Sequence, residues 1–520
     1  MKFRVGYITI ALLVFVAAAF ASCITETSIS NKEREKISLV AWIRLNKPEL
    51  EENYQEEGGY YVEVLEWGGD EAITPTENEL GNAPIMEQDT CWVYYNIVGR
   101  DMNGRVCLTR DGSLADLCGT FSYSTHYVPF FNYAGSNNQG LLEGTYLAMR
   151  HEITLGEEYR AKLGKSEPFY LRRGSKVRLY LPSSIAYGES GSSAEGGYEG
   201  QYSLDASRSM IMEIEVKSVI KNPSEKELDM VDAYIEGAAG WVQAEKAKRE
   251  DEDDTAEDNT TSDSENEGTT TDKTDDDTLK GLYYRLGFNP KTSDMASYRY
   301  VAPEKVGINN PYRDTKKYAN IDDINRRINE ILLERFGEGT TDLTDKTKVD
   351  INNTINVWYV LRFMDGYVLD TNIKEVRELV FDDQSGTESV YQYRHADSNP
   401  DSEKPASIAA WYYAIPYMHH GAYGEIVTTS AYAYGSVGIT GSTTTDTTTT
   451  TTPEMAYNNY YNYYNYYNNY YYGYNNYYNY YNYNYFASPS TDSETVTTTT
   501  ISTEVLPYTP LVFTIFVEEE

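Results

Sequence analysis

The sequence has few basic residues and few phenylalanines for its length of 520 residues. Its 44 Lys and Arg are outnumbered by 80 Asp and Glu, which gives a formal net charge of −36. Nucleic-acid binding needs clustered Lys and Arg to contact phosphates, so we expect no nucleic-acid partner. Only 14 Phe stand beside 51 Tyr. Because a buried tyrosine hydroxyl needs a hydrogen-bond partner, we expect part of this tyrosine to lie outside packed cores.

The motifs of several common catalytic sites are also missing. The chain has no GxSxG, Walker A, HExxH or dinucleotide-binding fingerprint. Its 5 His and 4 Cys show no zinc-ligand spacing. We therefore expect neither a metal nor a cofactor.

The long apolar run of the chain lies near its N-terminus. Lys2 and Arg4 precede apolar residues 8–20, which is typical of a secretory signal peptide over residues 1–22. The run ends in Phe20-Ala21-Ser22-Cys23, which resembles the lipobox of bacterial lipoproteins. That resemblance implies acyl chains such as palmitate on Cys23 and an anchor in the cell-envelope lipid bilayer. With no Asp after Cys23, an outer membrane is favoured. Ordinary signal-peptidase cleavage, leaving Cys23 a plain thiol, is the alternative.

The remaining cysteines are Cys91, Cys107 and Cys118. An exported compartment would permit one disulfide and one free thiol among them. Their spacing does not choose the pair.

Two low-complexity tracts interrupt the chain. Residues 249–279 hold fourteen Asp or Glu and almost no apolar side chain, which predicts a disordered acidic linker. Residues 457–485 consist of 17 Tyr, 11 Asn and one Gly, between Thr-rich stretches. Such tracts self-associate through stacking and amide ladders. Asp254-Thr255-Ala256 resembles the O-glycosylation acceptor of Bacteroidetes, although Thr/Asp-rich composition also produces it by chance.

Two helices are readable from apolar spacing. Ser224 and Glu227 predict a capping box at the start of a helix within 223–248, with an apolar face that includes Val242. A second helix is expected from Asn320 to Gly337, within an insertion over 293–345.

Four short blocks occur twice in the same order. They are Gly59-Tyr60-Tyr61 and Leu282-Tyr283-Tyr284; Trp92-Val93-Tyr94-Tyr95 and Val357-Trp358-Tyr359; 184–188 and 431–435; and 210–214 and 511–515. Strand-forming residues dominate both halves, and Asn103-Gly104 and Asp365-Gly366 predict hairpin turns. The repeat predicts two copies of one antiparallel α+β domain, over 23–222 and 280–520. The second copy would carry the Thr/Tyr/Asn-rich tract as a loop insertion over 440–505.

The repeated blocks resemble the pattern of FKBP-type peptidyl-prolyl cis-trans isomerases. That pattern has a V-x-Y strand, a D-G hairpin followed by F-D, a G-W helix start, P-x-x-x-A-Y-G and a last strand L-x-F-x-V. The resemblance implies two FKBP-like domains, each an antiparallel sheet wrapped around a short helix. They would be joined by a helix and the acidic linker.

In the second copy the resemblance names an aromatic pocket. Its implied catalytic residues are Tyr359, Asp370, Trp411, Tyr434 and Phe513, with Leu369 and Ile408 as pocket walls. Ser430 is read as replacing the proline before the A-Y-G block.

The first copy departs more from the pattern. Tyr95 and Tyr187 are its counterparts of the pocket tyrosines, but Cys107-Leu108 replaces F-D, the helix start lacks Trp, and Met212 replaces the last-strand aromatic. We therefore expect the second domain to be the active one.

The resemblance implies an envelope prolyl isomerase or folding chaperone with proline-containing polypeptides as clients. The alternative is a catalytically inactive FKBP-like lipoprotein whose Tyr/Asn-rich tract, 457–485, mediates adhesion or self-association.

Overall fold

The structure of the chain is a computed structural model. It describes residues 30–69, 78–121, 125–191, 204–246, 278–287, 289–290, 321–381, 388–402, 405–439, 442–450 and 494–519. The expected signal peptide, Cys23, residues 249–277 of the acidic tract and the tract 457–485 lie outside these ranges. Among the described helices, none combines the length and apolar character needed to cross a membrane.

The first domain is built on one antiparallel sheet of seven strands. Its order is β1-β2-β6-β7-β3-β4, and β5 also pairs with β3. The strands are β1 (Tyr54–Gln55), β2 (Tyr60–Glu66), β3 (Trp92–Asp101), β4 (Val106–Thr109), β5 (Phe130–Tyr133), β6 (Lys176–Leu181) and β7 (Met210–Ile220). Along β3, buried and partly buried residues alternate, as expected for a strand that covers a core with one face.

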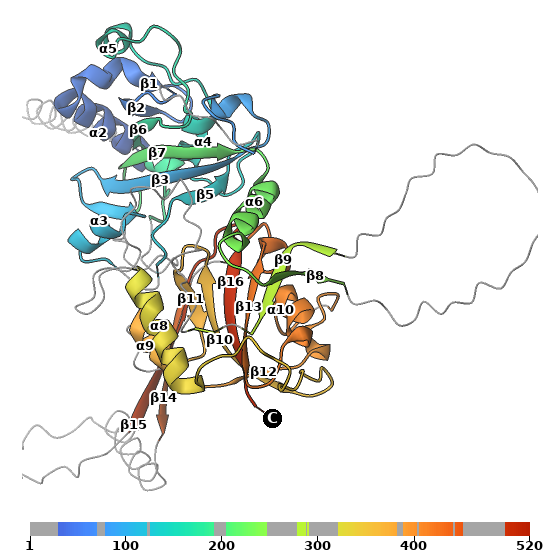
Figure 1. The fold of residues 1–520 in the computed structure, drawn as a ribbon. Coiled ribbons are helices and arrows are strands. Elements are labelled where there is room, and N and C mark those ends of the chain that lie inside the picture. Colours follow the sequence, from blue (N-terminus) through green and yellow to red (C-terminus); the bar gives the residue numbers. More distant parts are fainter. Residues whose placement is uncertain are drawn as a thin grey trace, which may run out of the picture.

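The second domain repeats this arrangement (Figure 1). Its order is β8-β9-β13-β16-β10-β11, and β12 also pairs with β10. The strands are β8 (Trp241–Glu245), β9 (Thr278–Leu286), β10 (Ile355–Phe363), β11 (Val368–Thr371), β12 (Tyr391–Tyr393), β13 (Ala422–Thr428) and β16 (Leu511–Val517). Each strand occupies the place of one strand in the first sheet. The α+β fold class, with two antiparallel sheets and accompanying helices, is confirmed.

Helices cover the sheets and connect them. They are α2 (Asn31–Asn46), α3 (Gly112–Leu117), α4 (Glu143–Arg150), α5 (Glu157–Lys162), α6 (Pro223–Ile235), α8 (Ile321–Phe336), α9 (Lys374–Phe381) and α10 (Ala409–Ala414). Short 3-10 turns are η1 (Pro48–Asn53), η2 (Ile85–Glu87), η3 (Ser183–Ile185), η5 (Ala396–Ser398), η6 (Ile415–Tyr417) and η7 (Ser430–Tyr432). Helix α8 ends before Gly337, which has a φ of 80°, as its sequence predicts.

The predicted capping box of α6 is wrong. Asn222 is the N-cap and accepts a hydrogen bond from the backbone N–H of Glu225. Glu227 instead reaches the second domain, where it binds Ser430. The helix also ends at Ile235, so Val242 lies in strand β8 rather than on the helical face.

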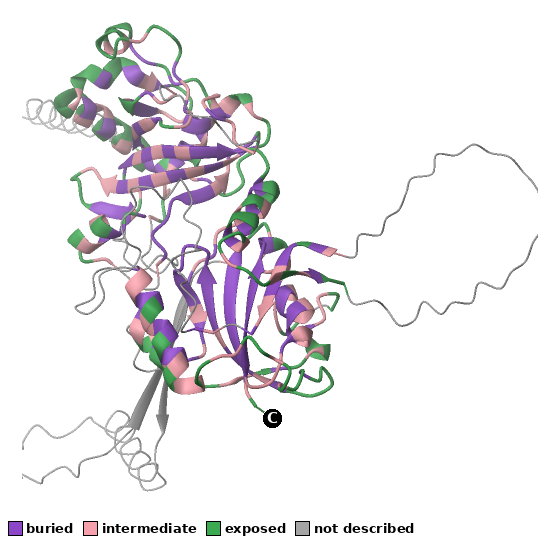
Figure 2. Ribbon diagram, in the orientation of Figure 1, coloured by how far each residue is buried: buried purple, intermediate pink, exposed green. Residues whose placement is uncertain are grey.

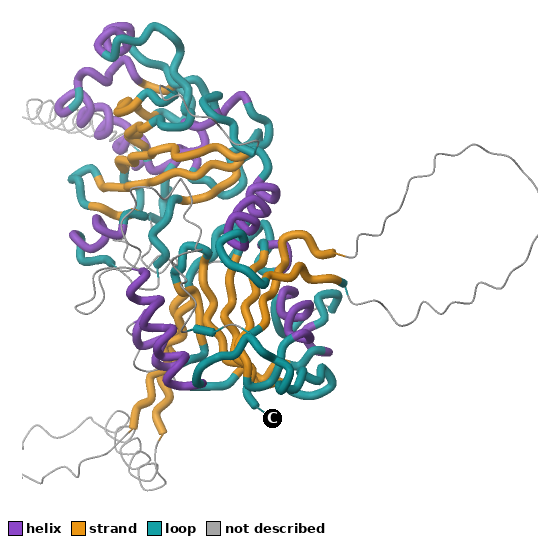
Figure 3. The backbone as a smooth tube through the Cα atoms, in the orientation of Figure 1, coloured by secondary structure: helices purple, strands orange, loops and turns teal. Residues whose placement is uncertain are grey.

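In the sequence, each low-complexity tract lies between two strands that pair with each other. Strands β8 and β9 pair antiparallel, and the chain between them contains the acidic tract. The tract therefore connects two neighbouring strands of the second sheet, and the prediction that it joins the two domains is wrong. The Thr-rich stretches form β14 (Ser442–Thr450) and β15 (Glu494–Ser502), an antiparallel ribbon that extends away from the domain (Figure 3). Threonine is branched at Cβ and favours strands, which explains the ribbon.

Each sheet carries its own core, shown as buried segments in Figure 2. In the second domain, α8 packs Ile324, Ile328 and Leu332 into the core. Side chains of β10 alternate between the two faces. Trp358 lies against Phe336 of α8, with ring centroids 5.9 Å apart, whereas the next residue, Tyr359, lies against Trp411 of α10. The α10 side is therefore the face on which a pocket can form.

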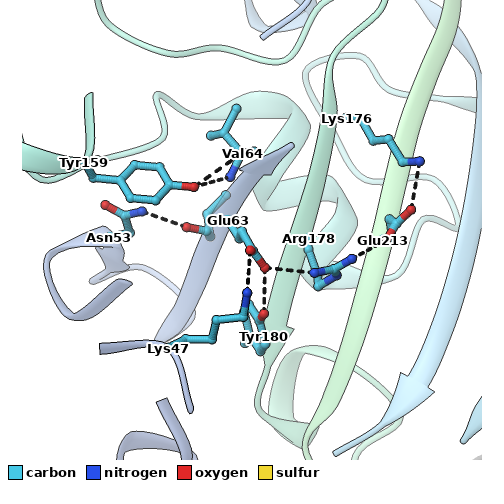
Figure 4. A network of polar contacts seen from close by, with 10 residues as sticks. Lys47, Asn53, Glu63, Val64, Tyr159, Lys176, Arg178, Tyr180 and Glu213 are labelled. Atoms are coloured by element: carbon cyan, nitrogen blue, oxygen red, sulfur yellow. Dashed lines mark hydrogen bonds and ion pairs between the residues drawn. The ribbon is translucent and has the colours of Figure 1, made fainter. Parts of the chain in front are cut away.

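Charged side chains link strands β2, β6 and β7 of the first sheet (Figure 4). Arg178 on β6 binds Glu63 on β2 at 3.0 Å and Glu213 on β7 at 2.8 Å. In the second sheet the register places Glu425 of β13 opposite Arg285 of β9, and these two side chains form an ion pair. Strands β6 and β13 occupy equivalent places in the two sheets. The charged residue on this strand is therefore a cation, Arg178, in the first domain and an anion, Glu425, in the second.

Among the described residues, Cys91, Cys107 and Cys118 form no disulfide with one another. Burial raises the pKa of Cys91 and of Cys107 to about 11. Both thiols are therefore protonated and poorly reactive at neutral pH.

Candidate functional site

The second domain holds a cavity of about 600 Å³ between α10, the central strands and the loop that follows η7. Five expected catalytic residues line it, together with the expected wall residue Ile408: they are Tyr359, Asp370, Trp411, Tyr434 and Phe513. The sequence blocks that are far apart along the chain thus converge on one space. Its volume is in the range of pockets that bind small ligands or peptide side chains.

Trp411 lies at the centre of the aromatic contacts. It is 4 % exposed, and Ile408 is the N-cap of its helix α10. Its ring meets Tyr359 and Phe513 edge-on, at centroid distances of 5.4 Å and 5.7 Å. Tyr391 meets it at 5.3 Å with an interplanar angle of 89°. These edge-to-face contacts fix the indole plane. Within the described residues, the buried indole Nε1–H has no hydrogen-bond partner.

Tyr359 and Asp370 form the polar pair of the pocket. The Tyr359 hydroxyl donates to Asp370 Oδ2 at 2.7 Å, and Asp370 Oδ1 accepts from the Thr371 N–H at 2.8 Å. Burial, and then the charge of Asp370, raise the pKa of Tyr359 well above its ordinary value. The phenol is therefore a permanent donor at neutral pH, and it holds one wall of the pocket in place.

Tyr434 supplies a second phenol from the loop after η7. Burial raises its pKa, with a further contribution from Asp370, so its hydroxyl also stays protonated. Gly435 follows with a φ of 66°, a conformation that favours glycine. Among the described residues none accepts a hydrogen bond from the Tyr434 hydroxyl, which leaves the donor available to a bound group.

Some pocket residues were not foreseen, and one expected wall was wrong. Leu369 is buried in the core and does not line the cavity, because side chains alternate along β11 and Asp370 takes the pocket side. Leu361 provides an apolar wall there, and it stands two residues after Tyr359 on the same strand face. Tyr391 also lines the cavity, and its hydroxyl donates to the Ala406 carbonyl at 2.8 Å. Period-2 spacing from Tyr359 would have found Leu361.

The proline position before the A-Y-G block also needs correction. Pro182 and Thr429 are the N-caps of η3 and η7, with φ of −68° in both. Thr429 rather than Ser430 therefore stands where the first domain has proline. Ser430 corresponds to Ser183, and both are buried.

The first domain has lost most of this pocket. Gly104 and Gly366 end equivalent turns, and both have a φ of 91°. Tyr359 stands seven residues before Gly366, and Ile97 stands seven residues before Gly104. Ile97 is therefore the counterpart of Tyr359, and the prediction that Tyr95 is its counterpart is wrong. Tyr95 instead donates to Asn132 at 3.0 Å.

Other pocket positions of the first domain are filled by smaller side chains. The N-caps Leu142 and Ile408 align α4 with α10, which places Thr145 where the second domain has Trp411. Its hydroxyl contacts Met212 Sδ at 3.2 Å, and Met212 holds the sheet position of Phe513. Both side chains are buried. Of the two predicted first-domain counterparts, Tyr95 and Tyr187, only Tyr187 lies at the equivalent position. It follows η3 as Tyr434 follows η7.

The structure shows no candidate metal centre in the ranges that it describes, in the sense of three or more grouped His, Cys, Asp or Glu side chains.

Comparison with known proteins gives likenesses of fold. No protein-family profile matches the chain, and no curated protein matches it. The three FKBP domains of wheat FKBP73 match 89 % of this chain and 95 % of theirs, at 10 % identity and a TM-score of 0.19. FkpA from Escherichia coli matches over 42 % of this chain and 75 % of its own, at 16 % identity and a TM-score of 0.21. A peptidyl-prolyl cis-trans isomerase from Pseudomonas syringae matches over 36 % and 92 %, at 18 % identity and a TM-score of 0.21. At these scores, any functional assignment depends on the residues of the pocket.

Proposed function

We propose that the second domain is a peptidyl-prolyl cis-trans isomerase that binds proline-containing polypeptides in the Trp411 pocket. The observation that carries the proposal is the convergence of Trp411, Phe513 and two protonated phenols on one cavity. Rotation about an X-Pro bond has a barrier of about 18–20 kcal/mol and takes tens of seconds or more unaided. It needs no nucleophile and no redox centre.

The pocket supplies what this rotation requires. A proline ring placed on the Trp411 indole, between Tyr359 and Phe513, would leave water, and so would the adjoining amide. The planar amide loses resonance in the twisted transition state, and a desolvated site that fits the twisted form lowers the barrier. Tyr434 would donate its hydroxyl to the substrate carbonyl. Asp370 would act by orienting Tyr359, because both of its carboxylate oxygens already accept hydrogen bonds.

The decisive experiment is a proline-limited peptide isomerisation assay on the full chain. We expect turnover that falls at least about tenfold in Trp411→Phe, which keeps an aromatic ring but loses the indole surface. Thr145→Ser, at the equivalent position of the first domain, is the matched control and should keep full turnover. Background turnover in the wild-type chain would rule out the proposal.

We also propose that the protein is exported and held at the cell envelope by acylated Cys23. The support is the order of charged, apolar and small residues before Cys23. Mass spectrometry of the mature protein, with Cys23→Ala as the control, tests this: the unmodified thiol in the wild type would contradict it.

A second candidate function is adhesion or self-association through residues 457–485. The observation that favours it is the β14–β15 ribbon, which extends away from the domain and ends at Thr450 and Glu494, on either side of the tract in the sequence (Figure 1). Deletion of 457–485 should abolish self-association and leave isomerisation unchanged. Turnover lost together with the tract would show that the tract serves the pocket instead.

A further inference from the structure

Each domain places a glutamate against the turn that precedes its A-Y-G block. In the second domain, Glu227 of α6 accepts the Ser430 N–H at 2.8 Å and the Ser430 hydroxyl at 2.7 Å. In the first domain, Glu35 of α2 accepts the Ser183 N–H and hydroxyl, both at 2.6 Å. The two helices occupy equivalent places, since each precedes the strands of its own domain.

The serine passes this contact on to the pocket tyrosine. The Ser430 carbonyl accepts N–H groups from Ala433 at 2.9 Å and from Gly435 at 2.8 Å. Those two residues flank Tyr434. The Ser183 carbonyl accepts from Ala186 and Gly188 at the same distances, on either side of Tyr187. One serine therefore connects the helix carboxylate to the backbone on both sides of the tyrosine.

The arrangement is retained in both domains although most pocket side chains differ between them. The turn is also held from a second side, because the Thr429 N–H donates to the Gly281 carbonyl at 2.8 Å. A Cβ atom at Gly281 would lie 2.8 Å from Leu228 Cδ2 of α6 and 2.5 Å from Thr429 Cγ2. Helix, strand and turn are thus in close contact around Glu227, which is 3 % exposed.

We infer that Glu227 is a positioning residue for the second domain, and that its carboxylate fixes the Ser430–Tyr432 turn and through it the place of Tyr434. The inference deepens the proposed isomerase function and rests on it. Glu227 does not line the cavity, and its two hydrogen bonds are to Ser430, so it acts through that residue.

The ionisation of Glu227 provides the means to test this role. Burial raises its pKa to about 7, although the two hydrogen bonds from Ser430 act in the opposite direction. Charged groups around it are engaged elsewhere: Lys226 pairs with Glu79, Asp229 accepts from Asn78, and Asp232 accepts from Tyr283. Hydrogen bonds to a carboxylate are stronger than those to a neutral acid. The raised pKa nevertheless means that the buried site disfavours the carboxylate relative to water, so the turn is held less firmly above pH 7 than below it.

The experiment uses the full chain with 3-fluorotyrosine at position 434 alone, so that its fluorine resonance reports on the tyrosine without turnover. We expect this resonance to shift between pH 6 and pH 8 in the wild type and to lose the shift in Glu227→Gln. Glu35→Gln, the same change in the first domain, should leave the shift intact. A resonance that does not move, or that moves equally in Glu227→Gln, overturns the inference.

Isomerisation measured on the same proteins separates the two claims. We expect kcat/KM of the wild type to fall about threefold to tenfold from pH 6 to pH 8, and that of Glu227→Gln to stay level. His395 is present in both, and burial lowers its pKa from 6.5, so it does not produce a difference between them. No turnover with an intact fluorine titration would refute the isomerase proposal alone. Turnover with the same pH profile in both proteins would refute the positioning role alone.

Discussion

His126 Nε2 lies 2.8 Å from Asp365 Oδ2, in a contact that joins the two domains and leaves both side chains almost fully buried. The imidazole also stacks on Phe363, with ring centroids 4.3 Å apart. Asp365 belongs to the turn between β10 and β11, so the first domain contacts a strand connection of the pocket domain directly. Arg110 and Glu504 form a second ion pair between the domains.

Loss of this contact should uncouple the unfolding of the two domains. We expect His126→Ala to destabilise the protein by about 2–4 kcal/mol, because Asp365 is left buried without that partner. Calorimetry should then resolve two separate unfolding transitions in the variant, whereas in the wild type the two domains are expected to unfold in overlapping transitions. His151→Ala is the control, since His151 is half-exposed and lies 3.4 Å from the exposed Glu57. An unchanged thermogram for His126→Ala would show that the junction contributes no stability.

Removal of one hydroxyl should test the role of Tyr434. Tyr434→Phe keeps the ring and loses the donor, so we expect kcat/KM to fall about threefold to thirtyfold with little change in stability. Tyr187→Phe makes the same change in the first domain and should leave turnover unaltered. Equal losses in both variants would mean that the first domain is also active.

The cross-strand ion pairs should differ in their contribution to stability. Glu425 is 0 % exposed beside Arg285, whose side chain is 13 % exposed, so Glu425→Ala leaves a largely buried guanidinium without this partner and is expected to cost about 3–5 kcal/mol in the free energy of unfolding. Glu213→Ala should cost about 1 kcal/mol, because Arg178 retains Glu63 and is 30 % exposed. Urea unfolding measures both, and similar costs would contradict the difference in burial.

Glu227 should make stability depend on pH in an unusual direction. Its folded-state pKa of about 7 exceeds the ordinary value of 4.5, so the folded protein keeps a proton that the unfolded chain releases between these values. The folded state therefore loses stability as the pH rises through this window, by up to about 3 kcal/mol. Glu227→Gln removes this term, so its stability relative to the wild type should increase from pH 5 to pH 8. Urea unfolding at several pH values measures this difference. A constant difference in the free energy of unfolding between the two proteins from pH 5 to pH 8 would contradict the shifted pKa.

Much of the pocket could be predicted from the sequence because its residues stand at fixed distances from glycines with positive φ. Gly366 and Gly435 mark the turns, and Asp370 and Tyr434 follow from them. The first-domain counterpart of Tyr359 could not be found from residue type. Tyr95 was chosen by residue type, whereas counting back from Gly104 leads to Ile97.

Other features could not be predicted because they depend on contacts far apart in the chain. Glu227 has the spacing of a helix cap, and its partner Ser430 lies 203 residues away. Tyr391 belongs to a three-residue strand with weak periodicity, β12, and enters the pocket through pairing with β10. The Thr-rich stretches pair as a ribbon although the long Tyr/Asn tract separates them in the sequence.

The positions of the two inserts allow either insert to change while the fold of the second domain stays the same. Each insert begins and ends on neighbouring hydrogen-bonded strands, whose backbones lie about 4.8 Å apart. Inserted chain of any length thus starts and finishes at nearly the same point, and the entropy of closing it grows only with the logarithm of its length. Lineages could lengthen, shorten or replace either segment without disturbing the sheet. A foreign sequence grafted between Thr450 and Glu494 should be displayed at the end of the ribbon with the Trp411 cavity unchanged.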